Sequence, residues 1–413
     1  MNIDFYRTNR RKILDGMEDE AVMIIFSGQA KYKSHDQFYK YVPNKSFYYL
    51  SGFDKEKSIL VLSKFRKSVQ EMLFIEKPDS YLELYHGKMT DKEDIVALTG
   101  IETVHYIEDL MKILSKMFVN NYYRIAYLDY FKRGIRAIPT EEMSFAELLE
   151  KNFPYLKMMD AFPLIANQRK IKTEEEIEAV KEAVKLTELG LNSILEHLKP
   201  GCMEYELEAH FQFAMKMNGG GDYAFDPIIA SGKNGVLLHY GENNSQINDN
   251  ELVLIDIGAE YGYYASDISR TYPSSGRFTP RQKELYEAVL EAEEEIIRAL
   301  KPGMPIDHMR NIADDILAKR CIEIGLIKEK EEIIRYLYHG VGHYIGLDTH
   351  DVGDRDILEP GMVLTVEPGL YIKEEGIGIR IEDDVLITEN GCDVLSKDII
   401  KSVNDIEQAM RRN

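Results

Sequence analysis

Two aspartates in one apolar segment are the first residues of this chain that could do chemistry. Residues 251–272, ELVLIDIGAEYGYYASDISRTY, predict a hairpin, and a two-residue loop at Tyr261 and Gly262 would set Asp256 opposite Asp267. Like charges that face each other directly destabilise a strand pair. Apolar residues surround Asp256 at both odd and even positions, so we expect its strand to be buried on both faces. A buried carboxylate must be paired, protonated or bound to a metal ion.

Two glutamates form a similar pattern further along the chain, in residues 362–388. A four-residue loop from Lys373 to Gly376 would set Glu367 opposite Glu382. Pro368 cannot donate a hydrogen bond to a ladder, so it predicts a strand end or an edge beside Glu367. Each of the two segments therefore contributes one acidic pair.

A glycine-rich segment, residues 339–351 with the sequence HGVGHYIGLDTHD, contains His339, His343 and His350. So much glycine disfavours a helix and predicts a backbone that passes close to another group. In an extended segment, His339 and His343 would share one face. The spacing differs from the His-Glu-x-x-His helix of zinc peptidases. His239, in the sequence VLLHY, is a further candidate for the same site.

Four carboxylates and an imidazole predict a centre with two metal ions. Two divalent cations would neutralise four carboxylates, whereas one would leave like charges crowded at short range. An oxygen-rich ligand set suits hard ions, so we expect Mn²⁺, with Co²⁺, Zn²⁺ and Fe²⁺ as alternatives. Two ions about 3.5–4 Å apart can acidify a bridging water and polarise a carbonyl or phosphoryl group. The residues alone therefore predict a hydrolase and leave peptides and phosphoesters open as substrates.

The elements that must position these residues form a repeat. Two predicted helices begin with capping boxes, in which Thr is followed three residues later by Glu or Gln, at 173–176 and 279–282. Both helices run into the same tetrapeptide, LKPG, at 198–201 and 300–303, and an amphipathic helix follows each. The second part of the chain therefore predicts two related halves, with one acidic pair in each.

Up to about residue 160, short apolar runs alternate with polar helical stretches. The predicted strands are AVMIIFS, SFYYLSGF, SILVLS, EMLFIE and YYRIAYL, and the predicted helices are DKEDIVAL and IEDLMKILSKMF. This alternation is typical of an α/β domain. We predict an α/β N-terminal domain over residues 1–165 and an α+β C-terminal domain over residues 166–413.

The composition argues against several other classes of protein. The 413 residues include 51 Lys and Arg against 71 Asp and Glu, and the resulting net charge of −20 repels nucleic acid. The longest apolar run, AVMIIF, is far shorter than the roughly 20 residues that a membrane span needs. The N-terminus lacks the apolar core of a secretory signal, and three widely spaced cysteines predict no disulfide framework. We expect a cytoplasmic protein with no membrane or nucleic-acid partner.

The order of the candidate ligands resembles that of the pita-bread metallopeptidases, most closely aminopeptidase P and prolidase. The similarity extends from NKSFYYLSGF through LLHY, LVLIDIGAEYGYYASDISRTYP and LEPGMVLTVEPGLY to RIEDD, and so covers nearly the whole chain. It implies a creatinase-like N-terminal domain and a pita-bread catalytic domain with a pseudo-twofold internal repeat.

The resemblance also implies a role for each candidate residue. Asp267 and Glu382 would bridge two metal ions, Asp256 would bind one of them, and His343 and Glu367 would bind the other. A hydroxide between the metals would attack the Xaa-Pro carbonyl, while Glu367 moves a proton to the leaving nitrogen. The remaining catalytic and substrate-binding residues implied by the family pattern are His239, His339, His350, Tyr371 and Arg380.

Substrate length separates the two branches that the chain resembles. Aminopeptidase P removes the first residue of longer Xaa-Pro peptides, whereas prolidase cleaves Xaa-Pro dipeptides. The full first domain favours aminopeptidase P, with prolidase and a non-catalytic pita-bread binding protein as alternatives. One departure concerns a Trp-x-Gly element of that branch, because this chain has Tyr85, His86 and Gly87 there and contains no Trp. Relatives of this kind imply a homodimer or homotetramer.

Overall fold

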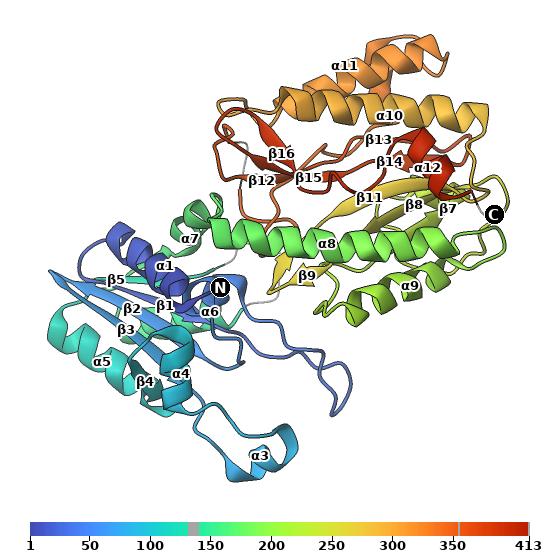
Figure 1. Cartoon of the computed structure of the whole chain (residues 1–413). Coiled ribbons are helices and arrows are strands. Elements are labelled where there is room, and N and C mark those ends of the chain that lie inside the picture. Colours follow the sequence, from blue (N-terminus) through green and yellow to red (C-terminus); the bar gives the residue numbers. More distant parts are fainter. Residues whose placement is uncertain (131–139, 354–355, 412–413) are drawn as a thin grey trace. The chain divides into compact units, whose positions relative to one another are not determined.

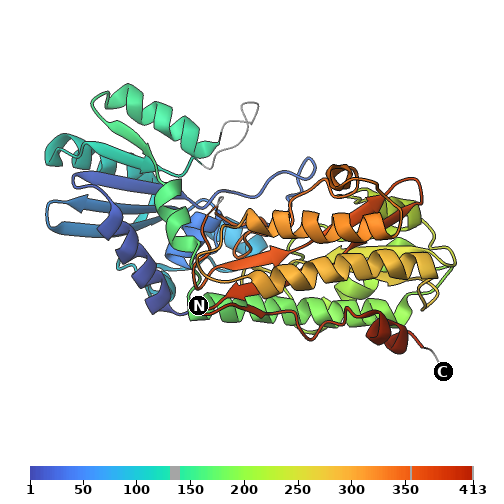
Figure 2. The same ribbon diagram turned by 90° about the horizontal axis from the view of Figure 1, so that it is seen from above.

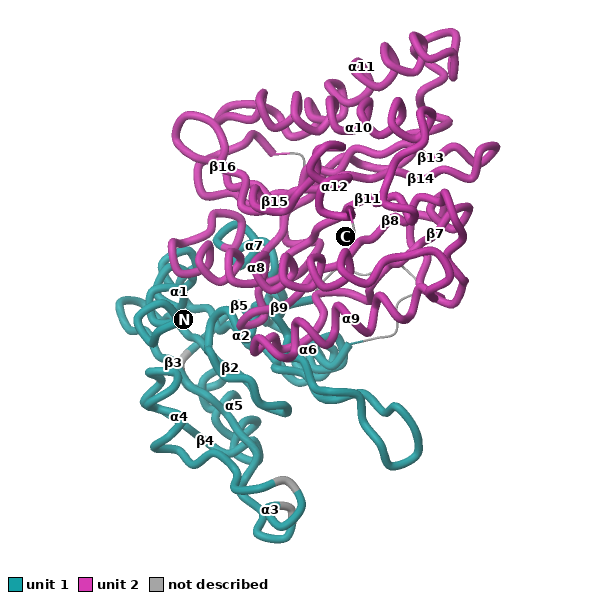
Figure 3. The backbone as a smooth tube through the Cα atoms, turned by 45° about the vertical axis from the view of Figure 1, so that its right-hand side comes forward, with its two compact units in different colours: residues 1–168 teal, residues 169–413 magenta. Residues whose placement is uncertain are grey.

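The computed structural model describes residues 1–130, 140–353 and 356–411, apart from the side chains of residues 82, 86 and 121. The chain divides into two compact units, unit 1 with residues 1–168 and unit 2 with residues 169–413 (Figure 3). The domain boundary expected near residue 165 falls a few residues before this division. No helix among the described residues has the length and apolar character needed to cross a membrane.

Unit 1 is built on a six-stranded sheet with the order β4-β3-β2-β1-β5-β6. The strands are β1 Ala21–Phe26, β2 Ile59–Phe65, β3 Ser68–Ile75, β4 Thr103–Tyr106, β5 Ile125–Leu128 and β6 Lys157–Asp160. The helices are α1 Ile3–Gly16, α2 Lys45–Ser51, α3 Ser80–His86, α4 Lys92–Thr99, α5 Leu110–Asn121, α6 Glu141–Asn152 and α7 Phe162–Arg169, with the 3-10 turn η1 at Ile107–Asp109. The predicted α/β class is confirmed.

Strand β1 is buried on both faces, which explains its unbroken apolar sequence. Val22, Ile24 and Phe26 point into a core that includes Leu114 of α5 and Leu149 of α6. Helix α2 contacts β1 and α1 contacts β2, so helices also accompany the sheet outside that core (Figure 1).

One predicted strand of unit 1 is wrong. The segment SFYYLSGF forms helix α2 instead, because local signals at its two ends override its aromatic, strand-like composition. The Asn44 side chain accepts a hydrogen bond from the Phe47 backbone and so caps the first turn. Gly52 ends the helix in the left-handed conformation, at φ 68°, which a residue with a side chain rarely adopts.

Unit 2 contains two three-stranded sheets, β11-β8-β7 and β12-β15-β16, and two short hairpins, β9-β10 and β13-β14. The strands of the first half are β7 Ile228–Ser231, β8 Leu252–Ile257, β9 Glu260–Tyr261, β10 Tyr264–Ala265 and β11 Ile268–Pro273. Those of the second half are β12 Val363–Val366, β13 Gly369–Ile372, β14 Ile377–Arg380, β15 Asp383–Ile387 and β16 Cys392–Val394.

The long helices of unit 2 pack in pairs against these strands (Figures 1 and 2). Helix α8 packs on α9 and contacts β9 and β10, whereas α10 packs on α11 and contacts β12 to β14. The helices are α8 Glu174–His197, α9 Glu204–Met217, α10 Pro280–Ala299, α11 His308–Glu323 and α12 Val403–Ala409, with the 3-10 turns η2 Gly232–Val236 and η3 Lys330–Arg335. Both predicted capping boxes are present, at the starts of α8 and α10.

The two LKPG segments have the same backbone conformation, which confirms the predicted repeat. Leu198 ends α8 at φ −60° and ψ 121°, and Leu300 ends α10 at φ −61° and ψ 125°. Gly201 and Gly303 both have positive φ, at 92° and 86°. Each LKPG therefore turns the chain from the first helix of its half towards the second.

The predicted register of the first hairpin is wrong by two residues. Asp256 pairs with Ser269 in the β8–β11 ladder, not with Asp267. The turn consists of Gly262 and Tyr263, at φ 56° and 70°, instead of Tyr261 and Gly262. Asp267 lies just before β11 and remains on the same face as Ser269, because alternate residues of a strand share a face.

The predicted register of the second hairpin is confirmed. Gly369 pairs with Arg380 in the β13–β14 ladder, and Val366 pairs with Asp383 in the β12–β15 ladder. Glu367 and Glu382 occupy the gap between these ladders, in the register that both ladders share.

Candidate metal centre

The two halves of unit 2 bring their acidic residues together from four strand ends. Asp256 is in β8, and Asp267 immediately precedes β11. Glu367 follows β12, and Glu382 precedes β15. All four carboxylates have low side-chain exposure or lie in buried residues, because they lie where the strands of the two halves meet in the interior.

His343 reaches the acidic residues from the glycine-rich segment. Its backbone is fixed to β12, where Thr365 N donates to His343 O at 2.8 Å and His343 N donates to Thr365 Oγ1 at 3.1 Å. Gly342 allows this approach, since an added Cβ would lie 2.3 Å from Thr365 O. The expectation that these glycines let the backbone pass close to another group is confirmed at Gly342.

The side chains of Asp267, His343 and Glu382 place one ligand atom each within 4.8 Å of the others. His343 Nε2 lies 3.4 Å from Asp267 Oδ2 and 3.7 Å from Glu367 Oε1. His343 Nδ1 lies 2.9 Å from Tyr344 O. When Nδ1 donates to this carbonyl, Nε2 presents its lone pair to the carboxylates, which is the tautomer that a metal ligand requires.

The acidic residues strongly disfavour each other's ionisation. Burial, and then the charge of Asp256, raises the pKa of Asp267 well above its usual value. Burial, and then Asp267, does the same to the pKa of Glu382. Burial raises the pKa of Glu367 to about 7, although His343 opposes this shift. A cation among these groups would allow them to ionise together.

Asp256 offers a direct test of whether this donor set fits a metal ion. Its Oδ2 accepts a hydrogen bond of 2.6 Å from Arg380 Nη2. Its Oδ1 is buried and has no hydrogen-bond partner among the described residues. A buried carboxylate oxygen without a partner is costly, and coordination to a cation would satisfy it. The four carboxylates and the imidazole therefore fit divalent cations.

A chain of hydrogen bonds supports the ligands from behind. Arg380 Nε donates to Ser269 Oγ at 2.7 Å, and Ser269 Oγ donates to Glu382 Oε2 at 2.8 Å. Arg380 Nη1 also donates to the Tyr371 hydroxyl at 2.9 Å, which lies 2.8 Å from His339 Nε2. Arg380 thus connects ligands of both halves with one of the histidines predicted to contact substrate.

The three remaining histidines lie near this cluster. His339 Nδ1 lies 3.7 Å from Glu367 Oε2, and burial lowers the pKa of His339 to about 4. The His350 ring meets the His343 ring edge to face, with centroids 4.3 Å apart. His239 is exposed, and its charge adds to the burial that lowers the pKa of both His339 and His350. The predicted site residues are therefore neighbours in space.

Ser269 and Asp384 are residues of this site that the sequence reasoning missed. Ser269 was missed because the predicted register put Asp267 in its place. Asp384 is buried, and its Oδ2 accepts a hydrogen bond of 3.2 Å from the Asp267 backbone. Its signal was present in the sequence, since Glu382 and Asp384 lie two positions apart at the start of β15, where alternate residues share a face.

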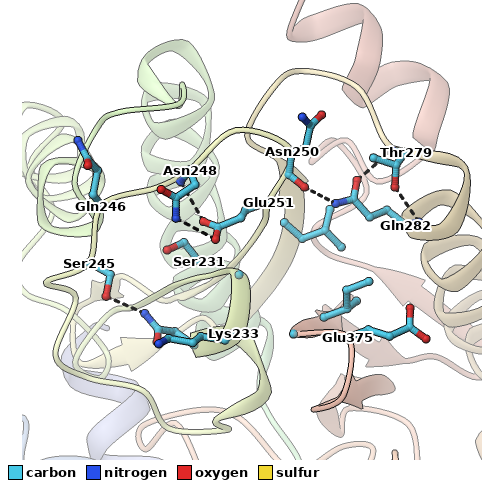
Figure 4. Close-up of a pocket in the computed structure, with 15 residues that line it drawn as sticks. Ser231, Lys233, Ser245, Gln246, Asn248, Asn250, Glu251, Thr279, Gln282 and Glu375 are labelled. Carbon is cyan, nitrogen blue, oxygen red and sulfur yellow. Dashed lines mark hydrogen bonds between the residues drawn. The ribbon is translucent and has the colours of Figure 1, made fainter.

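A separate polar pocket of about 590 Å³ lies at the starts of strands β8 and β14, where Leu252 and Ile377 line it (Figure 4). It is lined by residues that include Ser231, Lys233, Glu251, Gln282 and Glu375, and by none of the acidic residues or histidines described above. Glu251 accepts hydrogen bonds from the backbone and side chain of Asn248, and the Gln282 side chain donates a hydrogen bond to the Asn250 carbonyl. This pocket is therefore separate from the carboxylate cluster.

Comparison with known proteins agrees with this geometry. Residues 178–389 match metallopeptidase family M24, and residues 6–125 match the aminopeptidase P N-terminal domain. The chain is 33% identical to the Xaa-Pro aminopeptidase of Escherichia coli strain K12, over 98% of this chain and 97% of that protein. It is 31% identical to the Xaa-Pro aminopeptidase of Haemophilus influenzae, over 98% and 96%.

A solved structure shares both the two-domain fold and the length of the chain. Zinc-substituted Escherichia coli aminopeptidase P in complex with product superposes with a TM-score of 0.92 and 30% identity, over 100% of both chains. The pita-bread fold of the second domain and the creatinase-like fold of the first, both expected from the resemblance, are thereby confirmed. The protein belongs to metallopeptidase family M24, in the branch with an aminopeptidase P N-terminal domain.

Proposed function

We propose that this metallopeptidase removes the N-terminal residue from peptides with proline in second position. The observation that carries the proposal is the meeting of Asp256, Asp267, His343, Glu367 and Glu382 in one buried cluster. Similarity to Xaa-Pro aminopeptidases over nearly the whole chain supports the same substrate class. A peptide bond to proline is a tertiary amide without N–H, so peptidases that need this donor tend to spare it.

These five residues are our proposed ligands for two divalent metal ions, with Mn²⁺ preferred and Co²⁺ or Zn²⁺ as alternatives. Asp267 and Glu382 would serve both ions, one from each half of unit 2. Metal ions at this position would acidify a water molecule and polarise the scissile carbonyl.

Glu367 is our proposed proton carrier. Its Oε1 lies 3.7 Å from His343 Nε2 and its Oε2 lies 3.7 Å from His339 Nδ1, so one oxygen can bind a cation while the other takes up and releases a proton. Delivery of that proton to the proline nitrogen would let the leaving group depart as a neutral amine.

His239, His339 and His350 are our proposed substrate contacts. A hydrogen bond between the Tyr371 hydroxyl and His339 Nε2 orients the His339 ring. Arg380 Nη1 in turn donates a hydrogen bond to the Tyr371 hydroxyl and fixes its position. His350 is exposed beside His343, where its imidazole can donate a hydrogen bond to the substrate carbonyl as negative charge develops.

Hydrolysis of an Xaa-Pro-Yaa tripeptide beside the matching Xaa-Pro dipeptide tests this proposal. Metal-free protein is reconstituted separately with Mn²⁺, Co²⁺ and Zn²⁺, and metal content is measured by elemental analysis. We expect faster cleavage of the tripeptide and the highest activity with Mn²⁺. Faster cleavage of the dipeptide would instead identify a prolidase, and failure to cleave either peptide with any metal would reject the proposal.

Two further predictions rest on the sequence alone. We expect a cytoplasmic protein that forms a homodimer or homotetramer, and light scattering of the purified protein measures the assembly directly.

A further inference from the structure

A cluster of buried charges joins the start of unit 2 to the segment that contains His350. Arg169 Nη2 lies 2.6 Å from Asp351 Oδ1 and 2.7 Å from Asp348 Oδ2. Lys172 Nζ lies 3.0 Å from Asp351 Oδ2, in an ion pair without hydrogen-bond geometry. The side chains of Arg169, Lys172 and Asp351 are at most 3% exposed. Each oxygen of Asp351 therefore faces its own buried cation.

The carboxylate of Asp351 is held ionised and tightly packed. Burial alone would raise its pKa, but Lys172 and Arg169 keep the pKa of this carboxyl below its usual value. The backbone of Gly346 closes over the pair, because an added Cβ there would lie 2.2 Å from Asp351 Oδ2 and 2.9 Å from Lys172 Cε. Only glycine leaves room for this arrangement.

Asp351 follows His350 directly, so its position limits where the His350 imidazole can lie. The segment from His343 to Asp351 begins with a proposed metal ligand and ends at this ion pair. The rings of His343 and His350 are in contact at 4.3 Å. A shift of Asp351 would therefore change the contact between the two imidazoles.

The first half of this segment is also anchored by packing, because Tyr344, Ile345 and Leu347 are buried and Ile345 N donates to Val363 O at 3.2 Å. Gly346 O accepts a hydrogen bond of 2.7 Å from Ala265 N, and Thr349 Oγ1 donates to Ala224 O at 3.2 Å. A pocket of about 260 Å³ borders the segment and is lined in part by Tyr344, Asp351 and Gly353. Asp351 N donates to Tyr344 O at 2.9 Å, and Asp351 borders the pocket, into which the end of the segment can shift if the ion pairs are lost.

We propose that Lys172 and Arg169 are positioning residues for the peptidase reaction, which act through Asp351 to hold the His350 imidazole over the carboxylate cluster. The inference rests on the proposed function and deepens it, because it assigns a role to charged residues that touch neither substrate nor metal ligands.

The physical reason for a positioning role is the balance of energies in a buried ion pair. Desolvation of the two charges offsets most of their attraction, so such a pair contributes little net stability. Its geometry is nevertheless well defined, since any displacement leaves a buried charge without its partner. The cluster therefore serves to select one position of the segment more than to stabilise the fold.

The principal test compares Lys172→Met with the matched control Lys170→Met. Lys170 lies on the same segment and also forms an ion pair, of 3.0 Å with Asp356, but this pair is more exposed and is not adjacent to His350 in sequence. We expect Lys172→Met to lower kcat for an Xaa-Pro-Yaa peptide by about tenfold, or about 1.4 kcal/mol in activation free energy, with metal content unchanged. Lys170→Met should retain wild-type kcat, and an unchanged kcat in Lys172→Met would overturn the proposal.

A double-mutant cycle distinguishes positioning from a general structural defect. If Lys172 acts through His350, the Lys172→Met change should have almost no effect on kcat in a His350→Ala background. An equal loss of kcat with and without His350 would overturn the proposal. Should Lys172→Met fail to fold, Lys172→Gln replaces it, because glutamine removes the charge but keeps a hydrogen-bond donor for Asp351. Its loss of kcat should likewise disappear in the His350→Ala background.

A chemical readout separates this inference from the proposed function. Diethyl pyrocarbonate modifies exposed neutral imidazoles, and peptide mass spectrometry measures the rate at each histidine of metal-free protein. We expect Lys172→Met to change the rate at His350 relative to exposed His308, and Lys170→Met to leave it unchanged. If the wild-type protein cleaves no Xaa-Pro peptide, the proposed function fails, whereas an unchanged His350 rate in Lys172→Met rejects the positioning role.

Discussion

The two hairpins that supply the acidic residues differ in how far their registers follow from local sequence. In the second, Gly376 occupies the left-handed end of a four-residue loop, at φ 63°, and the predicted pairing of its strands is correct. In the first, the two-residue turn contains Gly262 and Tyr263, both with positive φ. Tightly turning hairpins of this type prefer glycine at the second position, where this chain has tyrosine.

The difference teaches that a turn residue predicts register only when it occupies the position that its turn type prefers. Placing Gly262 second moved the predicted turn by one residue and the pairing by two. A shift of two residues leaves every side chain on its face, whereas a shift of one would have reversed the faces. Asp256 and Asp267 therefore still converge, although Asp256 faces Ser269.

The largest expected effect tests whether metal binding depends on Asp267, the predicted partner of Asp256, or on Ser269, its observed partner. Asp267→Asn should lose metal and lower kcat by about a thousandfold or more, because a neutral amide is a poor ligand for two cations. Ser269 is the true register partner of Asp256, and Ser269→Ala should keep its metal and lose less activity, since it removes only the hydrogen bonds of the Ser269 hydroxyl with Glu382 and Arg380. Elemental analysis that finds two metal ions per chain in Asp267→Asn would contradict the ligand assignment.

The next effect concerns the second hairpin. Glu367→Gln should fold normally but lower kcat by about two to four orders of magnitude, because glutamine cannot carry the proton. Circular dichroism checks the fold, and metal content is measured in parallel. Turnover close to wild type in a fully loaded variant would remove Glu367 from the mechanism.

Backbone crowding provides a comparison of the two hairpins by stability. An added Cβ at Gly258 would lie 1.9 Å from Ser266 O, whereas at Gly376 its nearest neighbour would be 3.7 Å away. Gly258→Ala must therefore displace backbone and should cost about 3 kcal/mol of unfolding free energy. Gly376→Ala should lower the unfolding free energy by only about 1 kcal/mol, because alanine is strained in the left-handed conformation but meets no close neighbour. Urea titration of both variants measures the difference, and equal losses would refute the crowding at Gly258.

The smallest effect concerns Tyr263. Its φ of 70° is strained for a residue with a side chain, so Tyr263→Gly relieves about 1–2 kcal/mol. The greater freedom of glycine in the unfolded chain offsets about 0.5–1 kcal/mol of this gain. We expect a small net increase in urea midpoint, and a clear decrease would show that packing of the Tyr263 ring outweighs its backbone strain.

Local patterns account for the parts of the fold that the sequence predicted correctly. The capping boxes at α8 and α10 and the apolar strand β1 depend on residues within a few positions of one another. The same local reasoning failed for α2, where the Asn44 cap and Gly52 outweighed a strand-like composition. Competing local signals of similar strength need the tertiary environment to decide between them.

The five candidate metal ligands were determined by sequence, because buried carboxylates and glycine-spaced histidines restrict the chemistry that a chain can do. Only the tertiary structure decided their pairing with Ser269 and Arg380, and the contact of Arg169 and Lys172 with Asp351. Arg169 and Asp351 are separated by 182 positions. No periodicity or turn preference extends over that distance, so the approach of two such residues depends on how the whole unit packs.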